Sequence, residues 1–243
     1  MMPRRFSFLS TAFALITAML QVHTANAAEN PSVIELFTSQ GCSSCPPADE
    51  LLAKLATNPK IIALSMPVDY WDYLGWKDTF AQPVFTQRQR AYSATRGDRE
   101  VYTPQAVVNG LIHANGASLL DLNAAMSATE SDVTVPVVLA RDGESVSVSI
   151  AAAKGSKGGV ILAMPVIGQR EVAIGRGENA RRKVVYTNIV RGLVPLGSWT
   201  GTATTFALPA GVLKDADSVV VIVQSGSQAK PGGIVGAAHL ALR

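Results

Sequence analysis

The chain contains two cysteines, Cys42 and Cys45, three positions apart in "TSQGCSSCPPAD". A pair at this spacing can cycle between a disulfide and two thiols, because a mixed disulfide on the first sulfur lies within reach of the second. The residues before the pair, 32–39, predict a short strand, and "PPADELLAKLATN" after it predicts a helix. Since the start of a helix favours a thiolate, we expect Cys42 to be the nucleophile and Cys45 the resolving thiol.

The pair has other interpretations. A static disulfide across so short a loop adds little stability in the loop-entropy model. A structural zinc site normally needs four ligands, and beyond the N-terminal segment the sequence offers only His113 and His239. Two thiolates do suit copper(I). A possible thiol–disulfide oxidoreductase without an organic cofactor is therefore the leading interpretation, and a non-enzymatic protein that binds a partner protein or copper(I) is the alternative.

The surrounding elements would hold the pair. Strands at 32–39 and 60–70, helices after Pro83 and Ser118, and a hairpin at 103–116 follow one another in the order β-α-β-α-β-β-α. This alternation predicts a layered α/β domain with a partly parallel sheet. Beyond about residue 131 the segments are strand-like and separated by Gly-rich or charged turns, which predicts a second domain, a small antiparallel β-sandwich or barrel of six to eight strands.

The position of the CxxC pair and the order of elements resemble the thioredoxin fold. That fold has a cis-proline before its third core strand, facing the CxxC pair, and "YTPQAVVNG" places Pro104 at that point. The resemblance implies that the backbone of Thr103 pairs with a bound substrate peptide. Thioredoxin also keeps a buried acid on its first strand to move protons at the resolving cysteine. Glu35 is the nearest match here; alternatively, Glu35 faces solvent on an incompletely covered sheet.

Five segments together extend the resemblance over nearly the whole mature chain: "IELFTSQGCSSCPPAD", "VDYWDYLGWKD", "FTQRQRAY", "VYTPQAVVNG" and "GENARRKVVYTNIVRG". On these segments the chain is identified as a member of a family of secreted thioredoxin-like proteins, domain-of-unknown-function family 1223. The family implies a thioredoxin-like first half and supplies no established substrate. Gly41 and the Ser43-Ser44 pair differ from thioredoxin, which has tryptophan and Gly-Pro there, so the direction of electron flow stays open.

Two further segments could contribute to a site. The loop "YWDYLGWKD" leaves the second strand at the sheet edge that carries the cysteines, so Trp71 and Trp76 could form an apolar rim that faces a substrate. Packing against the second domain explains them equally well. The basic run "GRGENARRK" is typical of a solvated turn, with an anion site or ion pairs between domains as alternatives.

The first 28 residues have the layout of a secretory signal peptide, with Arg4 and Arg5, a short apolar run and a small-residue cleavage site. We therefore expect a thioredoxin-like domain at 29–130 and an all-β domain at 131–243, in a periplasmic or secreted protein. No later segment suggests a membrane span. The mature charge is nearly balanced, so nucleic acid is not an expected partner. The expected partners are an exported protein thiol or disulfide and a membrane electron donor.

Overall fold

The structure is a computed structural model that describes residues 30–243. The expected signal peptide lies outside the described residues. Within residues 30–243, no helix is long and apolar enough to cross a membrane.

The first half of the chain alternates strands and helices, as its periodicity predicts. Pro83 begins the second helix, and Gly97 ends it with a φ of 82° that suits glycine. Ser118 caps the third helix, where its hydroxyl accepts a hydrogen bond from the backbone N–H of Asp121. The elements are β1 Ser32–Thr38, α1 Pro46–Leu55, β2 Ile61–Pro67, the 3-10 turn η1 Asp72–Leu74, α2 Pro83–Arg96, β3 Gln105–Val108, β4 Ile112–Asn115, α3 Leu119–Thr129 and the 3-10 turn η2 Glu130–Asp132.

The second half contains strands and one 3-10 turn. In β6 the valines are buried and the serines are more exposed, as strict alternation in "SVSVSI" predicts. The elements are β5 Val137–Asp142, β6 Ser145–Ile150, β7 Gly159–Ala173, β8 Lys183–Val190, β9 Val194–Trp199, β10 Thr204–Ala207, the 3-10 turn η3 Ala210–Leu213, β11 Ser218–Ser227 and β12 Lys230–Ala241.

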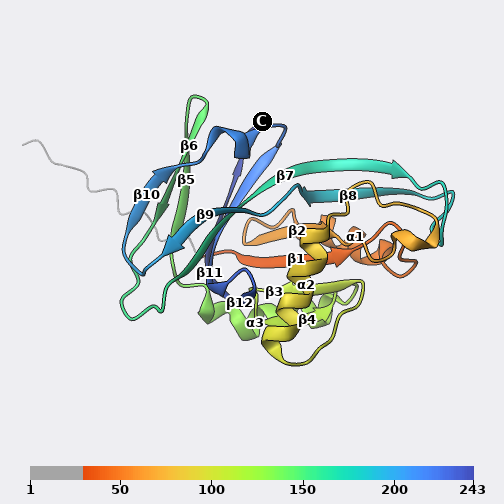
Figure 1. Ribbon diagram of the computed structural model, residues 1–243, viewed down its shortest axis with the longest axis horizontal. Helices are drawn as coiled ribbons and strands as arrows, with labels where there is room; N and C mark the ends of the chain where they lie inside the picture. Colours follow the sequence, from red (N-terminus) through yellow and green to blue (C-terminus); the bar gives the residue numbers. More distant parts are fainter. Residues whose placement is uncertain (1–29) are drawn as a thin grey trace, which may run out of the picture.

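The two halves share one nine-stranded mixed sheet in the order β12-β11-β7-β8-β2-β1-β3-β4, with β9 on β7 (Figure 1). The predicted fold class, a thioredoxin-like α/β domain followed by a separate β-sandwich or barrel, is therefore wrong. β8 runs parallel to β2 and joins its free edge, where Ser65 pairs with Ile189. Strand pairing removes exposed backbone groups at a sheet edge, and a sequence pattern does not reveal which distant strand does so.

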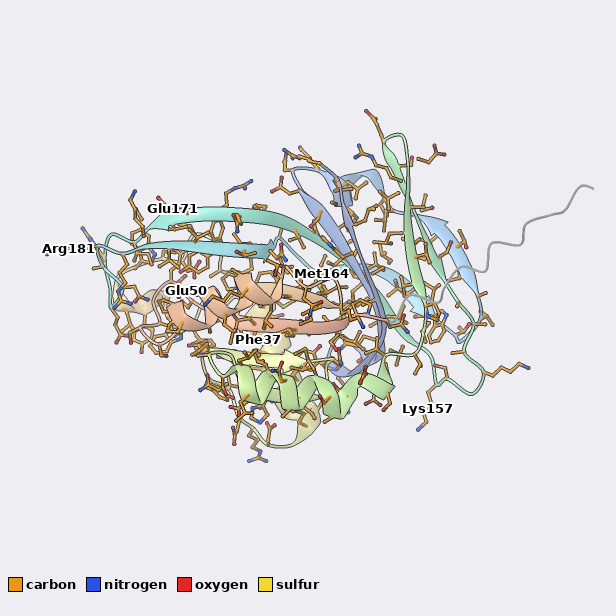
Figure 2. All side chains as sticks on the ribbon, turned by 180° about the vertical axis from the view of Figure 1, so that it is seen from behind. Phe37, Glu50, Lys157, Met164, Glu171 and Arg181 are labelled. Atoms are coloured by element: carbon orange, nitrogen blue, oxygen red, sulfur yellow. A yellow bond between two sulfur atoms is a disulfide. The ribbon has the colours of Figure 1, made fainter. Side chains whose placement is uncertain are left out.

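The main hydrophobic core also belongs to both halves. It lies on the α2 face of the sheet and combines β1, β2 and α2 with residues of β7, β11 and β12. Figure 2 labels two of its members, Phe37 on β1 and Met164 on β7. A second cluster, on the other face, joins α1 and α3 to β1 and β3. A third lies between β7, β11 and the small sheet β10-β6-β5.

The outer part of the β7–β8 hairpin, residues 169–187, extends past the edge of β2, and we call it the arm (Figure 1). The arm separates from β2 at Asn188, whose φ is 49°. The side-chain amide of Asn188 donates to the backbone carbonyl of Ala63 at 3.0 Å, in place of a backbone bond between the two strands. From there β8 packs against α1. The tip loop of the arm, residues 174–182, thereby reaches the end of the sheet where β1 stops.

Candidate functional site

The two cysteines form a disulfide in the loop between β1 and α1. Cys45 is the N-cap residue of α1, and Cys42 precedes it in a turn closed by the Cys45 N–H to Cys42 carbonyl hydrogen bond. Cys42 is 1% exposed and Cys45 is 0% exposed, although Ser43 and Ser44 between them face solvent. The disulfide is therefore formed and covered.

The start of α1 offers few hydrogen-bond donors to a thiolate. Pro46 and Pro47 occupy its first positions, and proline has no backbone N–H. The next two N–H groups, of Ala48 and Asp49, both donate to the Cys45 carbonyl. What the structure does place beside the sulfur is the Ser44 hydroxyl, with its Oγ 3.4 Å from the Cys42 Sγ. A Cys42 thiolate would therefore be stabilised by the helix dipole, and by this hydroxyl when the hydroxyl is not bonded to the Thr103 carbonyl.

The structure brings Thr103 and Pro104 to the same loop. The bond between them is cis, as the X-Pro pattern allows, and the Ser44 hydroxyl donates to the Thr103 carbonyl at 3.4 Å. A pocket of about 240 Å³ opens here, lined by Ser44, Tyr102, Thr103, Pro104, Asn115 and Ala117. It is a concave surface that lies next to the CxxC turn.

Both predicted tryptophans lie against the disulfide loop. A Cβ placed on Gly41 would lie 3.1 Å from the Cβ of Trp71, so the chain passes close to this side chain. The indole N–H of Trp71 donates to the Thr103 hydroxyl at 2.9 Å. The indole N–H of Trp76 donates to the side-chain carbonyl of Gln40 at 2.8 Å. The aromatic loop thus fixes both the disulfide loop and the segment before Pro104.

Glu35, the predicted proton acceptor, is buried, but it is bonded elsewhere. Its carboxylate forms a two-point ion pair with Arg88 of α2, at 2.7 and 3.0 Å, and accepts a hydrogen bond from the Tyr92 hydroxyl. Gln224 of β11 completes the group through bonds to Arg88 and Tyr92. The hydrogen-bond partners of Glu35 therefore come from α2, and the group ties the first half of the chain to the second.

Asp49, which the sequence reasoning missed, is the buried acid on the cysteine helix. It lies one turn after Cys45 and is 2% exposed. Its Oδ1 accepts a hydrogen bond from the Thr38 hydroxyl at 2.9 Å, and its Oδ2 is buried without a partner. Burial raises the pKa of Asp49 well above its usual value, and the charges of Asp78 and Glu50 add to this, against the Thr38 bond. The spacing Cys45-x-x-x-Asp49, one helical turn, was the available signal.

Two further titratable groups lie near Asp49. Asp78 accepts the backbone N–H of Gln40 at 2.8 Å, and burial raises its pKa despite three such backbone bonds. Tyr186 of β8 is buried, and its pKa is raised first by burial and then by the charges of Asp49 and Asp78. The end of the sheet beneath the disulfide loop is therefore acidic, and it favours neutral carboxyl groups.

The tip loop of the arm also contributes to the site. The side-chain amide of Asn179 donates to the carbonyls of Gln40 and Cys42, at 3.0 and 2.8 Å, and Asn179 is fully buried. The carboxylate of the neighbouring Glu178 accepts the backbone N–H of Ser43 at 3.2 Å. Both residues belong to the run "GRGENARRK", which the sequence reasoning interpreted only from its basic residues. In the described residues, no group of three or more His, Cys, Asp or Glu side chains is placed to bind a metal ion.

Comparisons with known proteins place the chain in a family. It is similar to the crystal structure of protein AGR_C_4864 from Agrobacterium tumefaciens, with 34% identity, a TM-score of 0.80, and coverage of 89% of this chain and 97% of that one. HBP35 of Porphyromonas gingivalis shares the fold at 16% identity and a TM-score of 0.54, over 88% of this chain and 76% of that one. A search of curated proteins found no match. The family DUF1223, described as "Protein of unknown function", matches residues 33–224, and the chain belongs to it.

Proposed function

We propose that the protein is an exported thiol–disulfide oxidoreductase that works through Cys42 and Cys45. The observation that carries this proposal is the closed CxxC disulfide at the start of α1, beside both a concave pocket and a buried protonatable carboxyl. A disulfide across a two-residue gap constrains the unfolded chain little, so stability alone explains it poorly. The signal-like residues 1–28 support a periplasmic or secreted location, where such a disulfide persists.

In the oxidised protein, a thiolate of a partner protein attacks the Cys42 sulfur. The Cys42–Cys45 bond breaks, a mixed disulfide forms, and Cys45 leaves as a thiolate that takes up a proton. A second thiol of the partner then loses its proton and attacks the mixed disulfide, which releases Cys42. The partner's dithiol is oxidised by two electrons and the CxxC pair is reduced. The reverse sequence reduces a partner disulfide, and a membrane donor would then re-reduce the pair.

Asp49 is the group that we propose exchanges the proton with Cys45, in place of Glu35. It lies one turn from Cys45, and burial raises its pKa well above the usual value, which favours the protonated carboxyl that could give its proton to the leaving Cys45 thiolate. In Glu35, by contrast, both carboxylate oxygens are already bound by Arg88 and Tyr92. Asp49 also keeps one oxygen, Oδ2, without a partner in the buried site.

The pocket lined by Ser44, Thr103 and Pro104 is the proposed entry for the partner's sulfur. The Thr103 carbonyl is bonded to the Ser44 hydroxyl at 3.4 Å, a long bond that an incoming backbone N–H could replace. Trp71 donates to the Thr103 hydroxyl and so fixes this segment beside the pocket. Thr103 and Trp71 thus have substrate-positioning roles, and Trp76 supports the loop from its other side.

The test is an exchange assay with the wild type, Cys42→Ser and Cys45→Ser. We expect the wild type to catalyse insulin reduction with dithiothreitol, or the oxidation of reduced ribonuclease in a glutathione buffer, and Cys42→Ser to lose this activity. Cys45→Ser should instead accumulate a mixed disulfide with the substrate, detectable by mass spectrometry. Full activity in Cys42→Ser, or no catalysis by the wild type in either direction, would refute the assignment.

A further inference from the structure

The tip loop of the arm fits closely onto the aromatic loop beside the disulfide. A Cβ on Gly175 would lie 3.0 Å from the Cζ3 of Trp76, and one on Gly177 would lie 3.5 Å from the Cβ of Trp76. Trp76 in turn holds the Gln40 side chain. Figure 2 labels Arg181 at the tip of the arm and Glu50 on α1 beneath it. Residues from the second half of the chain therefore lie against the loop that carries Cys42.

Asn179 makes the central contact. Its side chain is fully buried, and both of its bonds go to one short segment, the carbonyls of Gln40 and Cys42, which lie 139 and 137 positions away in sequence. Buried amide groups are costly unless they are hydrogen-bonded, so this contact specifies the position of the segment. The side-chain oxygen of Asn179, Oδ1, has no hydrogen-bond partner. The contact therefore fixes the disulfide loop at the expense of one unsatisfied polar atom.

Glu178 adds a second contact of a different kind. It accepts the N–H of Ser43, the residue after Cys42, at 3.2 Å. That N–H is a donor that a Cys42 thiolate could otherwise use, and the carboxylate places a negative charge nearby. In the observed arrangement Glu178 therefore opposes formation of the thiolate. Because Glu178 is exposed, its electrostatic effect is screened by water.

The tip loop is held together by its own backbone. Ile174 N–H donates to the Arg182 carbonyl at 2.9 Å, Arg181 N–H donates to the Ile174 carbonyl at 2.8 Å, and Arg182 N–H donates to the Asn179 carbonyl at 3.1 Å. These bonds do not involve the disulfide loop. The backbone structure of the tip loop therefore does not depend on Gln40 and Cys42. The tip loop is joined to the first half of the chain by the bonds of Glu178 and Asn179 and by packing of Trp76 and Phe80 on the cluster that contains Ile174.

We propose that Asn179 and Glu178 are positioning residues that hold the Cys42 segment in a covered state and thereby control access to the disulfide. A partner that displaces the tip loop releases the Cys42 segment, so that Cys42 can move toward the pocket at Thr103 and Pro104, and frees the Ser43 N–H in the same movement. This inference rests on the proposed function for its biological meaning, but the contact itself can be tested without any partner protein. The substrate class that it implies is a folded protein large enough to displace the tip, rather than a small thiol.

The first experiment compares the rate at which tris(2-carboxyethyl)phosphine reduces the disulfide in the wild type and in Asn179→Asp. Aspartate keeps the size of the side chain but, when ionised, removes both donors and faces two carbonyl oxygens. We expect the variant to be reduced about tenfold faster or more at pH 8, because two net hydrogen bonds are lost. Burial beside two carbonyl oxygens raises the pKa of the new carboxyl. As the pH is lowered from 8, aspartate becomes protonated and can donate once, so the variant-to-wild-type ratio should fall again.

The matched control is Lys183→Ala on the same arm, which removes an exposed ion pair with Glu171 and no contact to the disulfide loop. We expect its reduction rate to equal that of the wild type. Thermal unfolding of the oxidised proteins shows whether a faster reduction rate reflects easier access to the disulfide or a lower stability of the whole fold. A rate in Asn179→Asp equal to that of Lys183→Ala, or a rise that merely follows lost stability and does not reverse at low pH, would overturn the role of Asn179.

The second experiment measures the reduction potential in glutathione buffers for Glu178→Gln and for the control Glu171→Gln. Glutamine can still accept the Ser43 N–H but carries no charge. We expect a lower pKa for Cys42 and a higher potential in Glu178→Gln, because the thiolate of the reduced form is stabilised. Equal potentials in the two variants would overturn the electrostatic role of Glu178.

The outcomes distinguish this inference from the proposed function. Faster phosphine reduction of Asn179→Asp, with no catalysis of protein substrates by the wild type, would support the positioning role and refute the oxidoreductase assignment. Catalysis by the wild type, with no change in phosphine reduction for Asn179→Asp, would support the oxidoreductase assignment and refute the positioning role of Asn179.

Discussion

Two buried carboxyl groups lie on either side of the central sheet and differ in how they are satisfied. Glu35 is fully buried and bound by Arg88 and Tyr92, with Gln224 joined to both. Among residues 30–243, the Asp49 carboxyl has one hydrogen bond, from Thr38, no salt bridge, and a buried oxygen without a partner. A compensated charge is a structural feature, whereas an uncompensated acid shifts its pKa and becomes available for proton transfer.

The comparison shows that burial alone does not identify a proton-transfer group. The sequence argument selected Glu35 as the nearest match to the buried acid of thioredoxin, and the structure does bury it. What the sequence argument lacked was the partner set, which comes from α2 and from β11, 189 positions after Glu35 in the case of Gln224. Three predictions test whether the two carboxyl groups differ as this comparison requires.

The largest effect is expected for Arg88→Met. It leaves the Glu35 carboxylate buried without its cation, which costs about 3–5 kcal/mol of unfolding free energy. Chemical denaturation would measure the loss. Arg90→Met, at an exposed position on the same helix, is the control and should cost about 0.5 kcal/mol or less. Equal losses in the two variants would show that the buried Glu35–Arg88 pair contributes little to the unfolding free energy.

Tyr92→Phe should have an intermediate effect. It removes the hydroxyl that donates to Glu35 and accepts from Arg88 and Gln224. We expect a loss of about 1–3 kcal/mol, because partners are left buried and unsatisfied. The control is Tyr73→Phe, at a side chain that is 79% exposed, which should leave the denaturation midpoint unchanged. A neutral Tyr92→Phe would mean that Arg88 alone satisfies Glu35.

At about pH 4, Asp49→Asn should have the smallest effect of the three, and the difference in stability from the wild type should then change with pH. The native pKa of Asp49 is raised, so its stabilising contribution is present below about pH 4 and is lost as pH rises through the native pKa. The wild type should therefore become less stable relative to Asp49→Asn between pH 4 and 8, by at most about 1.4 kcal/mol per pH unit. Urea denaturation across this range measures the difference.

The control for this series is Asp121→Asn, an exposed acid in the first turn of α3 whose side chain is not buried. Its stability difference from the wild type should stay constant over the same pH range. A pH-independent difference for Asp49→Asn would show that Asp49 is ionised in the folded protein, and would remove the basis for its role in proton transfer.

Local signals in the sequence predicted the elements well and their assembly poorly. Pro83, Gly97 and Ser118 act within a few residues of themselves, so the helix limits they indicate are found in the structure. The pairing of β8 with β2 depends on a contact between Ser65 and Ile189 that no local pattern encodes. For this reason the strands of the second half were expected, but the separate domain built from them was wrong.

At the candidate site, too, local sequence and tertiary structure determined different features. By themselves, the residue types and spacing determined a CxxC turn between a strand and a helix, and a proline able to be cis at position 104. Tertiary structure decided that the disulfide is covered, that Asp49 rather than Glu35 is the uncompensated acid, and that Asn179 holds the Cys42 carbonyl. The physical reason is range: turns and caps depend on neighbours in sequence, whereas burial, charge compensation and access depend on residues that only folding brings together.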